Sequence, residues 1–248
     1  MAIKVMSQNV LCGEKKSPFS ARLPLMRKAL RDHGAAVIGL QEVTPAWKEM
    51  LDQLLPEFES ALMYRCEESP EAVPVYWDPR VVTAVESGHF WLSETPEVSS
   101  LGWDGRYPRV TSWACFEEKA TGKRFAFVNT HLDHRGEMAR REGIKLICRF
   151  VKQRFGADMP LVLMGDFNAR PDSPTIATAN DLLKDSRHVA KCSTDAPTFH
   201  DFGQSEPRII DYIYLTDNMN CTSFDIVRES DGQTCQSDHN GLIAQIEL

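Results

Sequence analysis

The sequence predicts an α+β protein in which two packed β-sheets are flanked by helices. Short apolar runs of strand length alternate with longer segments whose apolar residues recur every three to four positions. Two stretches share one layout, in which a strand and a helix lead to a second strand that ends directly in an acidic residue. The 248 residues contain no low-complexity linker and no break in composition, so we expect a single domain over 1–248.

The first stretch places its acidic residue at Glu42. Its helical segments carry apolar residues on one face, as helices packed on a sheet do. Ser20 and Thr44 are of the residue types that cap helix N-termini, and Gly34 is typical of a helix end. The expected elements are a strand over 2–10, a helix from Ser20 to Gly34, a strand over 35–40 and a helix from Thr44-Pro45.

The second stretch places its acidic residue at Asp166. The run from Pro160 to Met164 has the length and apolar character of a buried strand. Segments rich in Val, Tyr, Trp and Thr supply the other strands. The expected elements are strands over 124–130 and 160–164 around a helix at 137–155, further strands over 73–77, 80–85, 109–117, 208–215, 222–228 and 242–248, and a short helix near 174–184.

Composition and charge disfavour several classes of protein. The formal net charge of −7 argues against binding through a general polybasic surface, although a metal ion can still bind phosphate locally. The seven cysteines form no CxxC pair, which disfavours zinc-knuckle and redox motifs and predicts reduced, mostly buried thiols. The first residues lack a signal-peptide core, and no run approaches about 18 apolar residues. We therefore expect a cytoplasmic monomer with no membrane span and no obligate protein partner.

Polar side chains stand at the ends of many expected strands. Strand ends converge on one edge of a layered fold, so these residues are expected to line one site. Carboxylates, amides and imidazoles suit an octahedral cation together with phosphate, and they do not suit structural zinc. The alternative for the GDFN stretch is a capped loop in which Asp166 and Asn168 make turn hydrogen bonds. The residues are Asn9, Glu42, His131, Asp166, Asn168, Asp211, Asp238 and His239.

Asp211 is the most informative single position. Strand alternation places it on the same face as Ile209, Ile213 and Leu215. An unpaired carboxylate on an apolar face is costly, so it needs a partner, and His239 is the obvious candidate. The alternative is a structural aspartate in a bend.

Six short motifs in this order resemble the endonuclease/exonuclease/phosphatase superfamily of metal-dependent phosphoesterases. The resemblance extends over nearly the whole chain and implies a four-layer α/β/β/α sandwich of two mixed sheets. It also implies hydrolysis of a phosphoester by in-line attack of water, with Mg²⁺ or Mn²⁺ as cofactor. The motifs are SQN (7–9), LQEV (40–43), NTHLDH (129–134), GDFN (165–168), IDYI (210–213) and SDHNGL (237–242).

By this resemblance the metal site lies at the ends of the first strands and near the last motif. Glu42 is expected to be the main carboxylate ligand, with Asn9 and Asp238 beside it. Asp166 and Asn168 are expected to hold the phosphate and the attacking water, or a second cation.

The same resemblance assigns proton transfer to two imidazoles. His131 and His239 are expected to contact the scissile phosphate and share this role, with Asp211 orienting His239. Glu71 is the candidate acid behind His131, although its loop lacks the family's usual glycine. Arg109 is expected to reach the phosphate, with a surface ion pair as its alternative.

The substrate is the least determined feature. A phosphodiester in a nucleic acid or nucleotide is favoured by family membership alone, and a sugar, lipid-headgroup or other small phosphoester is the alternative. A non-catalytic binding protein on the same fold is a remote third possibility, because the expected catalytic residues are all present. His200 is a candidate substrate contact, and with Trp91, Trp103 and Tyr107 it is a candidate for an aromatic rim around a base or sugar. Core packing is the alternative for Trp91 and Trp103.

Overall fold

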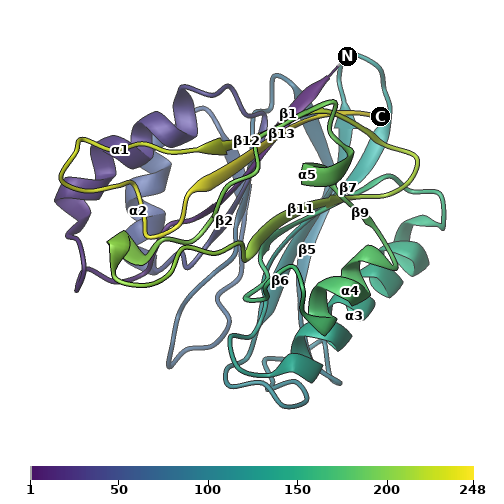
Figure 1. Cartoon of the computed structure of the whole chain (residues 1–248). Coiled ribbons are helices and arrows are strands. Elements are labelled where there is room, and N and C mark those ends of the chain that lie inside the picture. Colours follow the sequence, from purple (N-terminus) through teal and green to yellow (C-terminus); the bar gives the residue numbers. More distant parts are fainter. Residues whose placement is uncertain (1) are drawn as a thin grey trace.

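The computed structural model describes residues 2–248. Two mixed β-sheets pack face to face, and helices cover their outer faces (Figure 1). The strands are β1 (Ile3–Asn9), β2 (Val37–Gln41), β3 (Glu59–Ala61), β4 (Val75–Trp77), β5 (Val82–Trp91), β6 (Val110–Glu118), β7 (Arg124–His131), β8 (Leu161–Asp166), β9 (Lys184–Asp185), β10 (Cys192–Ser193), β11 (Asp211–Leu215), β12 (Asn220–Val227) and β13 (Gly241–Glu247). The helices are α1 (Phe19–Arg31), α2 (Pro45–Leu54), α3 (Glu137–Phe155), α4 (Pro174–Asn180), α5 (Ser186–Val189) and the 3₁₀ turn η1 (Asp201–Gly203).

The strand order confirms the predicted sandwich and its repeated layout. One sheet runs β10-β12-β13-β1-β2-β4-β3 and the other runs β5-β6-β7-β8-β11-β9. In each sheet the strand–helix–strand stretch forms a parallel pair, β1 with β2 through α1 and β7 with β8 through α3. Most other neighbours are antiparallel, so both sheets are mixed.

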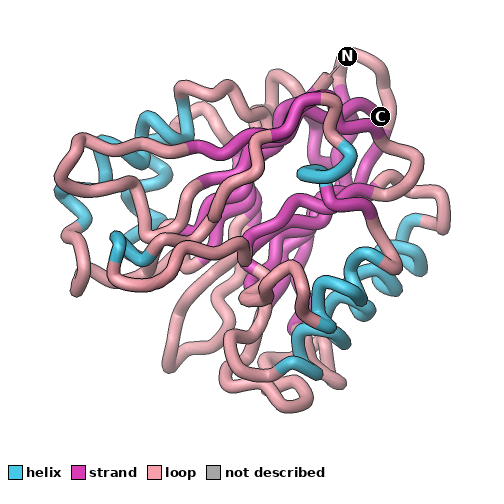
Figure 2. Tube along the Cα trace, viewed as in Figure 1, coloured by secondary structure: helices cyan, strands magenta, loops and turns pink. Residues whose placement is uncertain are grey.

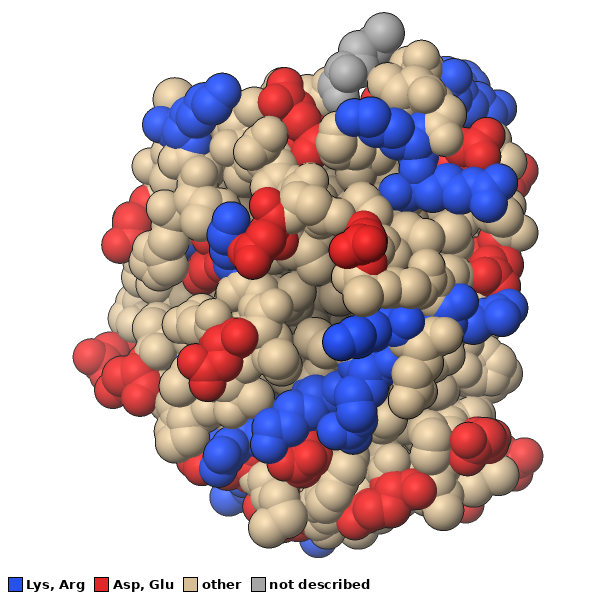
Figure 3. Space-filling model, turned by 90° about the vertical axis from the view of Figure 1, so that its right-hand side faces the viewer, with Lys and Arg blue, Asp and Glu red and all other residues tan. Residues whose placement is uncertain are grey.

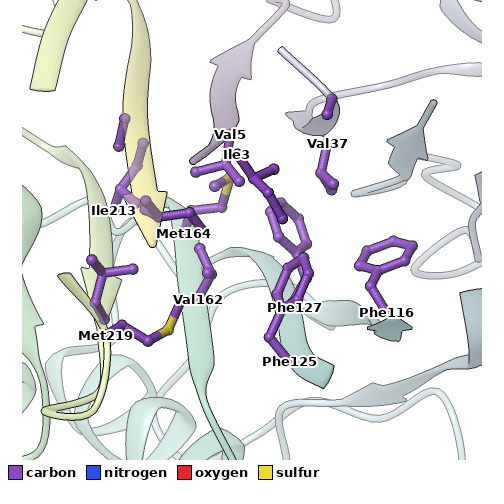
Figure 4. Packing of buried hydrophobic residues seen from close by; sticks show 14 of the residues in the cluster. Ile3, Val5, Val37, Phe116, Phe125, Phe127, Val162, Met164, Ile213 and Met219 are labelled. Carbon is purple, nitrogen blue, oxygen red and sulfur yellow. The ribbon is translucent and has the colours of Figure 1, made fainter. Parts of the chain in front are cut away.

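Three apolar layers hold the sandwich together. The central layer lies between the two sheets, where Val5, Phe127, Val162 and Ile213 meet (Figure 4). A second layer joins α1 and α2 to the first sheet, and a third joins α3 and α4 to the second sheet. Each sheet therefore has a buried surface on both faces.

Strand β8 illustrates why its sequence is apolar throughout. Val162 and Met164 point into the central layer, while Leu161 and Leu163 pack under α3 and α4. A strand covered on both faces has no solvent side, so no polar residue is needed until the strand ends. The polar side chains that follow are thereby concentrated at the end of the strand.

The predicted helix caps are half right. Thr44 caps α2, because its side chain accepts a hydrogen bond from the backbone N–H of Trp47. Ser20 as a cap is wrong, since α1 already begins at Phe19 after Pro18 and Ser20 lies inside the first turn. No side chain caps the N-terminus of α1, so the residues before the helix do not indicate clearly where it begins.

Strand lengths differ most from expectation at β5. The strand was expected over 80–85 and runs to Trp91, where a register shift between Ala84 and Glu86 lets it continue. From Thr83 to His89 exposed residues alternate with half-buried ones, because one face of the strand is only partly covered. The elements that the sequence did not predict are β3, β9, β10, α5 and η1, all of two to four residues.

The cysteines are all free, and their burial differs from the prediction. Only Cys115 and Cys221 are buried, while Cys192 is exposed and the other four are half-buried. "Mostly buried" is therefore wrong, because several thiols lie in loops rather than in the sheets. Within residues 2–248 none of the helices has the length and apolar character needed to cross a membrane.

Candidate active site

The strand register of the second sheet aligns three of the predicted site residues. His131 at the end of β7 is paired with Asp166 at the end of β8, and Asp166 is paired with Asp211 at the start of β11. In the first sheet, Asn9 at the end of β1 is paired with Gln41, and Glu42 follows directly. The neighbouring ends of parallel strands thus supply side chains from both sheets.

The backbone at these strand ends is unusual. Gly165 has φ 143°, and a Cβ at this position would lie 1.8 Å from the carbonyl oxygen of Thr130, so only glycine fits. Glu42 and Asn168 have φ values of 62° and 49°, a conformation that costs a non-glycine residue about 1–3 kcal/mol. Such strained conformations persist only where surrounding contacts hold the backbone in place. Glu42 follows a strand of the first sheet and Asn168 follows a strand of the second.

Asn9 connects the two halves of the site. Its Nδ2 donates hydrogen bonds to Glu42 Oε1 and to Asp166 Oδ2, both at 3.1 Å. Its Oδ1 accepts a hydrogen bond from the backbone N–H of Leu11 at 2.9 Å, which fixes the amide. Asn9 therefore orients two carboxylates from different sheets toward one another.

The two carboxylates experience different environments. Burial raises the pKa of Glu42, but hydrogen bonds from the Cys12 backbone and from Asn9 outweigh burial and lower it. Burial and the nearby charge of Asp211 raise the pKa of Asp166 from 3.8 to about 7. Glu42 is thus ionised at neutral pH, while Asp166 is able to gain or lose a proton.

Asp211 pairs with His239, as the sequence predicted from the need to compensate a buried acid. His239 Nδ1 lies 2.9 Å from Asp211 Oδ2, and its Nε2 points toward Asp166 Oδ2 at 3.8 Å. Burial by itself lowers the pKa of His239. The charge and hydrogen bond of Asp211, together with the charge of Asp166, outweigh burial and raise this pKa to about 10.

His131 lies on the other side of Asp166. Its Nε2 is 3.0 Å from Asn168 Nδ2 and 3.5 Å from Asp166 Oδ2. Burial and the nearby positive charge of Arg109 lower the pKa of His131 well below 6.5. The site therefore presents one neutral imidazole and one charged imidazole at neutral pH.

Glu42, His131, Asp166, Asn168 and His239 line one cavity of about 380 Å³, whereas Asn9 and Asp211 are not among its lining residues. Asp238 and Arg109 are on its wall, so the structure also brings these two predicted residues to the site. Arg109 is buried, with Nε 3.6 Å from Asp133 Oδ2, and the surface ion pair considered for it is wrong. The lining comprises Cys12, Glu42, Arg65, Ser69, Glu71, Tyr107, Arg109, His131, His134, Asp166, Asn168, Phe199, Arg208, Ile210, Asp238 and His239.

Two predicted contacts are placed differently. His200 is not among the lining residues, and its Nδ1 accepts a hydrogen bond from the backbone N–H of Phe202 instead. Glu71 lines the cavity, but its carboxylate forms a two-point ion pair with Arg65 at 2.8 and 2.9 Å. Glu71 is therefore paired with Arg65, and not with His131, whose acidic partner it was expected to be.

The aromatic rim is reduced to Tyr107. Trp91 is buried and donates from Nε1 to the carbonyl oxygen of Arg65, as the core alternative requires. Trp103 does not line the cavity, whereas Tyr107 does. Tyr107 stacks on His134 at 5.7 Å between ring centroids and lies under the Arg65 guanidinium at 4.8 Å.

Asp133 is an organising residue of the site that was not predicted. Its Oδ1 accepts hydrogen bonds from the backbone of Arg135 and Gly136 at the start of α3, both at 2.8 Å. Its Oδ2 accepts from the backbone of Arg106 and Tyr107, at 3.0 and 3.2 Å. The position of Asp133, two residues after a strand and shortly before a helix, could have indicated a cap for the helix. Its contacts with Arg106 and Tyr107 could not be predicted, because that loop is distant in sequence.

The donor atoms fit a divalent cation. Ligand atoms of Glu42, His131 and Asp166 lie within 4.8 Å of one another, as do those of Asp166, Asp211 and His239. The raised pKa of Asp166 reflects buried negative charge that a cation would compensate. Asp238 lines the same cavity, and Asn9, Glu42 and Asp238 as the metal site stays a prediction.

Comparison with known proteins identifies the class. The chain belongs to the Endonuclease/Exonuclease/phosphatase family, whose family model matches residues 6–239. Members of this family are phosphoesterase hydrolases, and the chain is an enzyme of this kind. Enzymes of the family depend on divalent metal ions, which agrees with the clusters of acidic residues and histidines.

Solved structures extend the similarity over the whole chain. An endonuclease/exonuclease/phosphatase from Bacteroides vulgatus is 31% identical, with a TM-score of 0.94 over 100% of this chain and 99% of that one. A mannosyl-6-phosphatase from Bacteroides thetaiotaomicron is 27% identical, with a TM-score of 0.88 over 99% and 100%. Nocturnin from Drosophila melanogaster is 38% identical over 89 residues, or 33% of this chain. The curated relatives are matched over only 30% and 14% of their own lengths.

Proposed function

We propose that the chain hydrolyses a phosphoester by in-line attack of water at the cavity between the ends of the two sheets. The observation that carries this proposal is the convergence of Glu42, Asp166 and two imidazoles in opposite protonation states on one wall. Pairs of titratable groups whose pKa values are pushed apart are typical of acid–base catalysis.

Asp166 and His239 carry the proton transfers in this proposal. Asp166 Oδ1 accepts a hydrogen bond from the backbone N–H of Asn168 at 2.8 Å and Oδ2 accepts one from Asn9 at 3.1 Å, and the second lone pair of Oδ2 accepts a proton from the attacking water. His239, held protonated by Asp211, donates from Nε2 to the phosphoryl group or the leaving oxygen. His239 Nε2 lies 3.8 Å from Asp166 Oδ2, so both groups can reach a phosphoryl group that is bound at this point of the cavity.

The remaining residues bind and orient the phosphoryl group. Arg109 supplies a buried positive charge, and Asn168 orients His131 through the contact of its amide with Nε2. Glu42, with Asp166 and His131, is the candidate set of metal ligands, and Asp238 adds negative charge to the same wall. When bound, a Mg²⁺ or Mn²⁺ ion supplies Lewis-acid stabilisation of the charge that develops on the phosphoryl oxygens.

A small organic phosphoester is the substrate class that the site favours. The cavity is compact, and the similarity to a mannosyl-6-phosphatase over the full chain supports a small substrate. A nucleotide or nucleic-acid phosphodiester, expected from family membership, is the second candidate, and the cavity arginines Arg109 and Arg208 are the features that favour it.

The test is a hydrolysis screen with Mg²⁺ and Mn²⁺ over sugar phosphates, nucleotides, phosphoinositides, single-stranded and duplex DNA, and RNA. We expect turnover that a chelator abolishes. In Glu42→Ala, activity should fall by at least about 100-fold and Mg²⁺ affinity by at least about 10-fold, because the ion loses a charged ligand.

Glu49→Ala is the matched control, because Glu49 is an exposed glutamate on α2. Circular dichroism should show that both variants are folded. Unchanged Mg²⁺ affinity in Glu42→Ala, measured by calorimetry, would remove Glu42 from the metal site.

A further inference from the structure

A larger cavity of about 1120 Å³ lies next to the active site. Its walls are the loop between β3 and β4, over residues 63–70, and parts of the loop between β5 and β6, at 99–101 and 107–108. Arg65, Ser69 and Tyr107 line both this cavity and the active-site cavity. The long loops that build it leave the sheets at their lower edge in the view of Figure 2. A molecule bound in one cavity can therefore extend into the other.

The wall between the two cavities is held by hydrogen bonds. The carbonyl oxygen of Arg65 accepts from Trp91 Nε1 at 2.8 Å and from Ser99 Oγ at 2.7 Å, which ties the two loops together. The Arg65 guanidinium is paired with Glu71 and also donates to the carbonyl oxygen of Ser69 at 3.0 Å. Arg65 is therefore a fixed part of the wall whose charge is already compensated.

The surface of the larger cavity is mostly apolar. Met63, Pro70, Leu101, Tyr107 and Pro108 are on its walls. Leu101 is 52% exposed and Tyr107 is 40% exposed, although both are large apolar side chains. Two such side chains on the walls of one cavity beside an active site are typical of a ligand-binding surface rather than of scattered surface residues.

The charge of this cavity is unfavourable for a second anionic group. Glu67 and Glu68 are exposed on its wall, and Arg65 is the only basic residue that lines it. Since Glu71 compensates Arg65, a phosphate or carboxylate in this cavity would meet two carboxylates and no free cation. The single phosphoryl group of a substrate is instead matched by Arg109 and His239 in the active-site cavity.

We propose that the larger cavity receives the organic part of the substrate. The preferred substrates are then esters with one phosphoryl group joined to a neutral aromatic or flat apolar group that packs on Tyr107 and Leu101. This inference rests on the proposed phosphoester hydrolysis and adds the class of substrate. Extended polyanions, which carry further phosphates into the larger cavity, are disfavoured by Glu67 and Glu68.

The test compares three primary alkyl phosphates whose leaving groups are chemically alike: propyl, 3-phenylpropyl and 3-carboxypropyl phosphate. Each is offered to the metal-loaded enzyme as the monoester and as the methyl diester. We expect kcat/KM for the phenylpropyl ester to exceed that for the propyl ester by about 10-fold or more, because a ring is removed from water. The carboxypropyl ester should be poorer than the propyl ester, because its carboxylate faces Glu67 and Glu68.

A charge placed on the apolar wall should remove this preference. Leu101→Glu should lower the ratio of kcat/KM for the phenylpropyl ester over the propyl ester by about 10-fold. The ratio is independent of the fraction of enzyme that is folded, so a loss of stability cannot imitate the result. Leu182→Glu is the matched control, because Leu182 is 47% exposed and does not line the cavity. Its ratio should equal that of the unmodified enzyme.

An enzyme with no preference for the phenylpropyl ester, or a Leu101→Glu variant with an unchanged ratio, would overturn the inference. Cleavage of an oligonucleotide without turnover of any of the six esters would also overturn it, while leaving phosphoester hydrolysis intact. The absence of metal-dependent turnover of every phosphoester would instead remove the proposed function itself.

Discussion

The two histidines of the active site have pKa values that are shifted in opposite directions. Burial and the nearby positive charge of Arg109 lower the pKa of His131, whose Nε2 contacts the Asn168 amide and lies 3.5 Å from Asp166 Oδ2. His239 is adjacent to two carboxylates, Asp211 and Asp166, so its pKa is raised to about 10 in spite of burial. The difference comes from the partners alone, because both rings are buried.

Asp211→Asn tests the role of the carboxylate behind His239. The variant keeps a side chain of the same shape but removes the charge that raises the pKa of His239, so the pKa should fall. The alkaline limb of the pH–rate profile should move to lower pH, and kcat should fall by about 10²- to 10⁴-fold. An unchanged profile at normal rate would return Asp211 to a purely structural role.

The same pair makes stability depend on pH. Folded His239 binds its proton more tightly than an unfolded histidine, whose pKa is about 6.5. The stabilisation from the pair is therefore complete below a pH of about 6.5 and is lost as the pH rises toward about 10. Denaturant unfolding of Asp211→Asn should show a smaller loss of stability across this range than the unmodified chain shows.

At the scale of elements, the loop between β1 and α1 is organised by Arg22. This arginine of α1 is fully buried and donates hydrogen bonds to the carbonyl oxygens of Val10 at 2.6 Å, Gly13 at 2.8 Å and Ser17 at 3.1 Å. The loop in turn places the backbone N–H of Cys12 2.9 Å from Glu42 Oε2. Arg22 is thus a positioning residue for the main candidate metal ligand.

Arg22→Met should therefore weaken metal binding at a distance. We expect a loss of about 2–4 kcal/mol of stability, because several buried carbonyls lose their donor. Mg²⁺ affinity should fall by about 10-fold or more, because Glu42 loses a fixed hydrogen bond. Arg27→Met is the control, since Arg27 is exposed on the same helix. A variant with lower stability and unchanged Mg²⁺ affinity would show that Arg22 supports the fold alone.

The ends of the central strands could be predicted from the sequence, whereas the loops around them could not. Asp166 ends one apolar strand and Asp211 begins another. Strand alternation and the cost of burying a charge were sufficient to predict that Asp211 pairs with His239. The partner of Glu71 depends on how the loop over residues 62–74 folds on itself, and no local pattern encodes that. The larger cavity needs two loops that are separated in sequence by β4 and β5.

For the whole molecule, the basic residues are unevenly distributed. Lys and Arg side chains gather in a band on the face that carries α3, where Arg149 and Lys152 are exposed (Figure 3). No basic residue of α3 lines the active-site cavity. With a net charge of −7, the molecule therefore presents few cations to a phosphate chain that enters the site.

Binding of duplex DNA should consequently depend weakly on salt. We expect at most about 2–3 phosphate contacts, mainly through Arg109 and the metal site, and a slope of log affinity against log salt of about −2 to −3. The measurement uses Asp166→Asn, a fluorescent oligonucleotide and several salt concentrations at fixed Mg²⁺. Tight binding with a much steeper slope would contradict this expectation and would indicate an extended basic track, with the face of α3 as the first place to look.

The order of strands in the first sheet also determines when the enzyme can become active during its synthesis. β13 is paired on one side with β1 and on the other with β12. β1 can pair with β2 early, but its second neighbour exists only after residues 241–247 have been synthesised. Until then the apolar faces of Ile3 and Val5 have no complete central layer to join, which is the condition that favours chaperone binding or aggregation. Asp238 and His239 emerge from the ribosome just before β13. A nascent chain therefore has neither a closed sandwich nor His239 until residues 239–247 have been translated.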